Sequence, residues 1–205
     1  LTVAGNVSVD GGTIKLDGNF PTGTDNVALG QNALANVTTG QKNTAIGDDA
    51  MFANTEGNYN VAIGEGSIED NTTGGFNVGI GRQALNSNTT ASNNTGVGYF
   101  VLAANTTGAN NAAFGFGALD ASTTASNNTA VGYASLSANT TGAQNTAVGG
   151  NTLDANTTAN NNTAVGYNSQ TSNTTGFANS SLGQGSLFSN TTGANNTAIG
   201  NGALD

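Results

Sequence analysis

The sequence predicts an all-β protein, a parallel β-solenoid built from 17-residue coils, and two observations predict this fold. An Asn recurs at a fixed step from Asn26 to Asn196 without one insertion, as between Asn128 and Asn145 (145 − 128 = 17). A Gly follows four residues after each of these Asn residues, from Gly30 to Gly200. An unbroken repeat is typical of solenoids, in which each coil buries its apolar side chains only against its neighbours.

The first 25 residues do not follow the repeat. Their apolar residues alternate with polar ones, as in Val7 and Val9 before the turn Asp10-Gly11-Gly12. This pattern is typical of short strands and hairpins. We therefore expect residues 1–25 to form an N-terminal β capping segment and residues 26–205 to form a solenoid of eleven repeats. Because the last repeat is truncated, we expect the sequence to be part of a longer chain.

Two apolar columns are the candidate core when each repeat is numbered from its Asn. Position four is mostly Val or Ile, as at Val131 and Val148, and position nine is mostly Leu, as at Leu136 and Leu153. The spacing between the columns suffices for a strand, a turn and the start of a second strand. The sequence thus predicts a flattened coil with two short parallel ladders.

The Gly and Asn columns predict the corners of the coil. Gly132 and Gly149 stand at position five, where a left-handed backbone or the close approach of the next coil would exclude a side chain. Asn128 and Asn145 start their coils, and positions twelve to fifteen read mostly Asn-Thr-Thr-Gly. In a parallel stack, identical amides lie ~4.8 Å apart and can hydrogen-bond along the column.

The composition excludes several classes of function. Only 7% of the residues are charged, the net charge is −9, and the three cations are Lys15, Lys42 and Arg82. Three cations cannot neutralise a nucleic-acid backbone or bind an anionic membrane surface. No apolar run is long enough to insert into a membrane. We expect no nucleic-acid partner, no membrane insertion and no cofactor.

The chain also lacks the side chains of most enzymes. It has neither His nor Cys, so acid–base chemistry would depend on its twelve carboxylates. The pairs Asp48-Asp49 and Glu69-Asp70 are candidates for glycoside hydrolysis, which requires two carboxyl groups facing each other across a pocket. Neighbours on one coil edge do not meet that requirement. We therefore predict no catalytic residue and no enzymatic activity.

Position six is charged in the early coils. Asp48, Asp49 and Glu65 offer the hard oxygen ligands that Ca²⁺ prefers, but their spacing matches no known calcium loop. The simpler interpretation is a solvated edge with a weak ion pair between Glu65 and Arg82. We predict no metal site.

Position six becomes aromatic farther along. Tyr99, Tyr133 and Tyr167 are candidate glycan-binding residues, because aromatic rings repeated along a rod can stack on sugars. The alternative is that these rings and Phe116 pack on each other or across a subunit interface, as aromatic side chains often do in sheets.

The Thr-rich positions suggest a third function, ice binding, since a flat face bearing Thr can order water. Adjacent residues in a strand point to opposite faces, so Thr140 and Thr141 cannot share one plane. An ice-binding face would have to combine the Asn and Thr columns at positions twelve and fourteen. The alternative is that these columns only stabilise turns.

Two apolar residues per coil make a thin core. Burying an aliphatic side chain contributes ~1.5 to 3 kcal/mol, whereas ordering one residue costs ~1 to 2 kcal/mol of backbone entropy. A further buried face would offset part of this cost, so we expect oligomerisation.

Several repeats resemble a known family motif. Asn43 to Gly47 reads NTAIG, and Asn128 to Gly132 and Asn145 to Gly149 read NTAVG. These segments resemble the NSVAIG-type motif of trimeric autotransporter adhesin heads. The 17-residue period and the leading segment are more similar to bacteriophage tail fibres, particularly those of marine and cyanobacterial phages.

The resemblance implies a left-handed β-roll in a homotrimeric fibre that binds a host cell-surface glycan or protein receptor. It places the protein in a virion tail fibre, outside the cell, with a role in host attachment. The alternatives are an adhesin head on a bacterial cell surface and an ice-binding solenoid.

Overall fold

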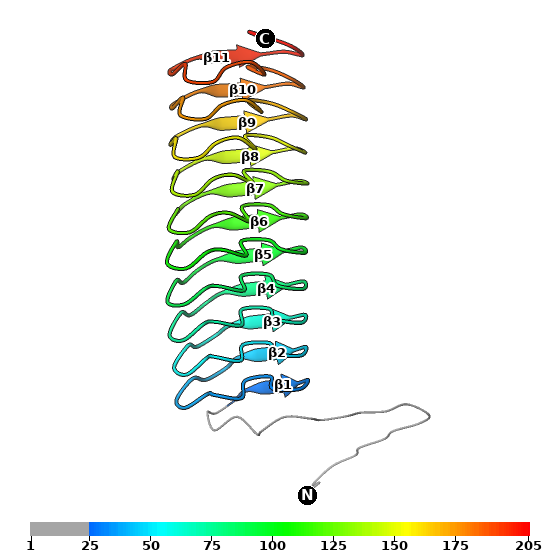
Figure 1. Cartoon of the computed structure of the whole chain (residues 1–205), viewed down its shortest axis with the longest axis vertical. Helices are drawn as coiled ribbons and strands as arrows, with labels where there is room; N and C mark the ends of the chain where they lie inside the picture. The colour runs from blue at the N-terminus through cyan, green and yellow to red at the C-terminus, as the bar shows by residue number, and fades with distance from the viewer. Residues whose placement is uncertain (1–24) are drawn as a thin grey trace, which may run out of the picture.

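The computed structural model describes residues 25–205, so the predicted capping segment lies outside the described residues apart from Asp25. The described part is a single stack of coils, with one strand of each coil in a sheet that runs along the long axis (Figure 1). The parallel β-solenoid with about 17 residues per coil is confirmed.

Each coil contributes one strand of three residues. The strands are β1 (Val27–Leu29), β2 (Thr44–Ile46), β3 (Val61–Ile63), β4 (Val78–Ile80), β5 (Thr95–Val97), β6 (Ala112–Phe114), β7 (Thr129–Val131), β8 (Thr146–Val148), β9 (Thr163–Val165), β10 (Ser180–Leu182) and β11 (Thr197–Ile199). They form one parallel sheet in sequence order, and equivalent positions pair, as Ala130 does with Ala147.

The sidedness of the strand corrects the prediction for position four. Side chains alternate along a strand, so positions two and four share one face and position three takes the other. Ala130 and Ala147 at position three are fully buried, whereas Val131 is half-buried and Val148 is 36% exposed. Column four therefore lies on the outer face of the sheet and not in the core, because the narrow coil has room only for small residues inside the strand, which are Ala, Gly or, at Ser181, Ser.

The core lies around column nine, as predicted. Leu136 and Leu153 have no exposed surface, and buried Ala residues at positions three and eight surround this column. Gln170 is the polar member of the column and is also fully buried. Leu204, in the last coil, is 62% exposed because no further coil covers it.

The second predicted ladder is not a strand. The residues after the Gly corner form consecutive turns, although their backbone groups still bond to the neighbouring coil, as Leu136 N does to Thr152 O at 3.0 Å. Left-handed backbone at positions seven and nine curves this segment, with φ of 48° at Ala134 and 54° at Leu136. Leu rarely adopts this conformation, which costs roughly 1–2 kcal/mol per residue and is offset here by burial of the side chain.

The glycine corners show both features predicted for them, a positive φ and the close approach of the next coil. Gly132 has φ of 136°, and a Cβ built on it would lie 2.4 Å from the carbonyl oxygen of Gly149 in the next coil. A Cβ at that distance from a backbone carbonyl oxygen would clash with it, so no residue other than Gly can stand here. Position five therefore requires Gly both for its backbone conformation and for the spacing of the coils.

The two Asn columns hold the coils together in different ways. At position one, Asn128 donates from Nδ2 to the carbonyl of Gly142 across its own coil, and its Oδ1 accepts the backbone N–H of Asn145 at 2.9 Å. At position twelve an amide donates both to the amide of the preceding coil, as Asn156 Nδ2 does to Asn139 Oδ1 at 2.8 Å, and to the carbonyl three residues on, as Asn156 Nδ2 does to Ala159 O at 3.2 Å. The amide ladder is thus confirmed at position twelve, while column one bonds chiefly to backbone.

One residue interrupts the ladder of column twelve. Ser122 stands where its neighbours carry Asn, and it is fully buried. Without an amide at this level, Asn105 Oδ1 and Ser122 Oγ are buried without a hydrogen-bond partner. Unpaired buried polar atoms of this kind cost roughly 1–3 kcal/mol each.

The glycine corner predicts a steric test. Gly132→Ala should lower the free energy of unfolding by more than about 2 kcal/mol, because the new Cβ meets a backbone carbonyl that cannot move without displacing the next coil. Denaturant unfolding followed by circular dichroism measures the change. The control is Gly117→Ala, since a Cβ on Gly117 would meet only Asp120 Oδ2, at 3.9 Å, and Ala134 holds the same position one coil later. Equal losses in the two variants would contradict the explanation.

The interrupted ladder predicts a stabilising substitution. Ser122→Asn should raise the free energy of unfolding by about 1–2 kcal/mol, because the new amide would donate to Asn105 and accept from Asn139. The reverse variant, Asn88→Ser, recreates the same break and should lower stability by a similar amount. Ala follows three residues later at both sites, at Ala125 and Ala91, so the comparison is matched. A loss of stability in Ser122→Asn would show that the ladder is not the limiting interaction.

Candidate functional site

Two of the candidate carboxylates accept hydrogen bonds from amide side chains of neighbouring coils. Residues 25–205 contain no group of three acidic side chains that could hold a metal ion, so Asp48, Asp49 and Glu65 are not gathered into one. Asp49 instead accepts a hydrogen bond from Asn32 at 2.9 Å, and Glu69 accepts one from Asn86 at 2.8 Å. The adjacent carboxylate pairs are therefore parts of surface columns.

Two hollows lie near the last coils, and neither resembles a carboxylate pocket. The first has a volume of about 210 Å³ and is lined by residues of β9, β10 and β11, none of which is charged. The second has a volume of about 270 Å³ and contains one carboxylate, Asp205. Acid–base hydrolysis of a glycoside needs two carboxyl groups facing each other, and neither hollow has them.

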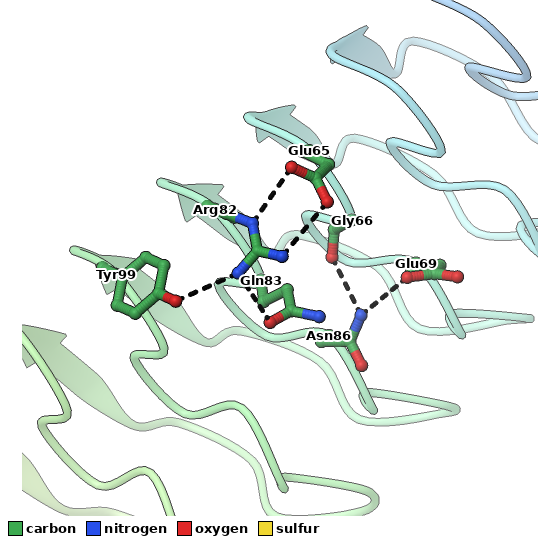
Figure 2. Close-up of polar contacts among 7 residues, drawn as sticks. All are labelled: Glu65, Gly66, Glu69, Arg82, Gln83, Asn86 and Tyr99. Atoms are coloured by element: carbon green, nitrogen blue, oxygen red, sulfur yellow. Dashed lines mark hydrogen bonds and ion pairs between the residues drawn. The ribbon is translucent and has the colours of Figure 1, made fainter.

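Arg82 links the polar and aromatic parts of column six (Figure 2). Its Nε donates to Glu65 at 3.0 Å and its Nη2 to the other Glu65 oxygen at 3.3 Å, which confirms the predicted ion pair. Its Nη1 donates to Tyr99 Oη at 3.0 Å. The hydrogen bond that Arg82 donates to the Glu65 carboxylate raises the pKa of Arg82. The pair is exposed to solvent, so it adds little to stability.

The aromatic part of column six is a stack of rings. Tyr99 and Phe116 lie 5.4 Å apart between ring centroids, and Phe116 and Tyr133 lie 5.5 Å apart, with the planes nearly parallel in both pairs. Tyr167 lies two coils beyond Tyr133, next to Gly150. The structure thus brings Tyr99 and Tyr133 into one stack through Phe116 and leaves Tyr167 outside it.

The stack limits what these rings can bind. Tyr133 is 61% exposed and Tyr167 is 55% exposed, but each ring of the stack has at least one face against a neighbour. Sugars stack on ring faces, and within the stack Phe116 has a ring neighbour on both sides, whereas Tyr133 has one. Glycan binding at Tyr99, Tyr133 and Tyr167 stays a prediction.

A second aromatic column, at position seventeen, was missed by the sequence analysis. Tyr59 and Phe76 stack with centroids 5.0 Å apart and planes 7° apart, and Lys42 lies over the Tyr59 ring at 5.1 Å. The signal was available, because these three residues follow the same step along the chain. Columns six and seventeen are the exposed corners at the two ends of each strand.

The outer face of the sheet is unusual for a surface. We call it the sheet face, and it consists of positions two and four of all eleven strands. None of these residues is charged, and position four is Leu, Ile, Val or Phe throughout. Phe114 is 42% exposed and Leu182 is 51% exposed, so the apolar column meets solvent in a single chain. A continuous exposed apolar strip marks an interaction surface.

The ice-binding face proposed from columns twelve and fourteen is not formed. Asn105 and Asn139 at position twelve have no exposed surface, because they face the inside of the coil. Thr at position thirteen bonds to the next coil, as Thr140 Oγ1 does to Thr157 O at 3.1 Å. Only the Thr column at position fourteen is exposed, as at Thr141.

Two carboxyls at position ten predict a dependence of stability on pH. Burial raises the pKa of Asp120 and of Asp154, and Asp154 Oδ1 is buried without a partner. A raised folded-state pKa means that folding is favoured when these groups are protonated, and this contribution is lost as the pH rises through that pKa. The variant Asp120→Asn/Asp154→Asn should therefore be more stable than the unmodified chain at pH 7, by less than about 1 kcal/mol for such partly exposed groups.

Unfolding midpoints measured between pH 3 and pH 8 test this expectation. The advantage of the double variant should disappear below about pH 4, near the ordinary pKa of Asp. Asp70→Asn, at an exposed position, is the control and should show no such advantage. If the unfolding midpoints of the unmodified chain, the double variant and Asp70→Asn changed with pH in the same way, this expectation would be contradicted.

Comparison of the chain with protein-family models, curated proteins and solved structures finds no match. Residues 25–205 also include no helix with the length and hydropathy to cross a membrane. The fold and the surfaces described above are therefore the grounds on which a function can be argued.

Proposed function

We propose that the chain is a rod segment of a homotrimeric extracellular fibre that serves attachment to a host cell. In this proposal it is a left-handed β-roll of the kind found in virion tail fibres. Its role is structural and adhesive, without catalysis. Its partners are two further copies of itself and a glycan or protein receptor on the host surface.

The sheet face is the observation that carries the proposal. At ~4.8 Å per coil, eleven strands make a strip roughly 50 Å long. An uncharged apolar strip of this length is costly in water and favours association with a matching surface. A second copy offers the same strip with the same coil spacing.

The regularity of the rod also supports a role as a spacer. Equivalent residues pair in all ten strand contacts between β1 and β11, without a bulge or slip. Hydrogen bonds along the stack resist bending, so such a rod holds whatever it carries at a fixed distance. The carboxylates of residues 25–205 are dispersed over surface columns, which fits a mechanical role better than a chemical one.

The molar mass of the purified chain tests assembly. Light scattering should give a mass near 60 kDa, three times the 20.0 kDa of one chain (3 × 20.0 = 60). Val148→Lys should shift the mass toward 20.0 kDa, because it places a charge on the sheet face. Thr141→Lys, on the exposed column fourteen, is the control and should leave the mass unchanged. A monomeric unmodified chain would overturn the proposed fibre.

Attachment is tested separately from assembly. Fluorescently labelled chain should bind to a subset of bacterial isolates, and an excess of unlabelled chain should displace it from the same sites. Tyr133→Ala measures the contribution of the aromatic column, with Thr141→Ala as the control. Binding that is unaffected by Tyr133→Ala would remove Tyr133 as a receptor contact, and binding to no isolate would restrict the segment to a structural role.

A further inference from the structure

Two exposed columns border the sheet face, one at each end of the strands. The leading column is position seventeen, two residues before each strand, and the trailing column is position six, two residues after it. At β7 these residues are Asn127 and Tyr133. Five residues lie between them, including the extended strand β7, so the two side chains stand at opposite ends of their own strand.

The two columns nevertheless carry complementary residues at two levels of the stack, β2 and β4. At β2 the leading residue is Lys42 and the trailing residue is Asp48, which carry opposite charges. At β4 the leading residue is the exposed ring of Phe76 and the trailing residue is Arg82, a pair suited to a cation–π contact. No level from β1 to β11 places like charges at both ends of a strand.

The columns also match in size. From β5 to β9 the leading residue is Asn at every level except β8, where it is the longer Gln144. At that same level the trailing residue is Gly150, while at the neighbouring levels it is Tyr133 or Tyr167. Thus Gln144, the longer side chain of the leading column, and Gly150, which has no side chain, lie at the two ends of the same strand, β8. Contact between the columns would explain this, and a single chain provides none.

Rotation about an axis parallel to the rod provides that contact. All strands run in the same direction and all coils have the same height, so such a rotation keeps each coil level with its copy. With the sheet faces directed toward the axis, the end of one strand meets the start of the neighbouring strand. The contact is head-to-tail and closes into a ring.

We propose that copies of this chain assemble in register around such an axis, with the trailing column of each copy against the leading column of the next. The inference rests on the assembly in the proposed function and specifies its interface. Lys42 then faces Asp48 of the next copy, and Asn127 faces Tyr133. In this arrangement the rings of column six lie at the subunit boundary, so sugar binding to them and this contact exclude each other.

Cysteine cross-linking tests the arrangement, because the chain contains no Cys. In the full 205-residue chain, Asn127→Cys/Tyr133→Cys places one thiol on each column. Mild oxidation should give covalent oligomers on denaturing gels that end at one largest species, the closed ring, at about 60 kDa for a trimer (3 × 20.0 = 60). The single variants Asn127→Cys and Tyr133→Cys are the controls and should stay near 20.0 kDa, since a head-to-tail contact brings unlike columns together.

Charge exchange gives a second test that needs no cysteine. Lys42→Asp should increase the dissociation constant of the assembly by roughly tenfold, and adding Asp48→Lys should restore it. Light scattering separates the possible failures. An oligomer that does not cross-link, or that cross-links in a single variant, would overturn this interface and leave the fibre standing, whereas a monomer would overturn both.

Discussion

The fold depends on backbone hydrogen bonds that run from each coil to the next. Backbone N–H groups donate to carbonyls at the same position or a nearby one of an adjacent coil, as Thr140 N does to Thr157 O and Leu136 N does to Thr152 O. A single inserted residue would break this register for a whole turn. Coil length and coil shape are therefore fixed together, and every side chain becomes part of a column. This constraint on coil length explains why the repeat in the sequence has no insertion.

The columns divide the stabilising interactions among them. Leu at position nine provides the apolar core. Buried Asn amides at positions one and twelve add hydrogen bonds within and between the coils. The cost is local strain, since Leu136 and its equivalents have left-handed backbone. Where the pattern lapses, polar atoms lose their partners, as at Ser122 and at Gln170 Oε1.

The outer surface follows from the same constraint. A narrow coil admits only Ala, Gly or Ser inside its strand, so the larger apolar residues of the strand face outward and form the sheet face. The corner columns then border this face at both ends of every strand. One geometric requirement, the width of the coil, thus yields both a thin core and an exposed apolar surface.

The sequence by itself determined the period, the glycine corners, the buried column nine and the Glu65–Arg82 pair, because each depends only on equivalent residues lying one above another. Ring stacking of Tyr99, Phe116 and Tyr133 follows from the same rule. Only the tertiary structure decided that Val131 and Val148 face outward, since alternation puts positions two and four together without saying which face is inside. It also decided that the residues after the Gly corner form a series of turns. Leu rarely adopts a left-handed backbone, so its presence at position nine did not predict turns.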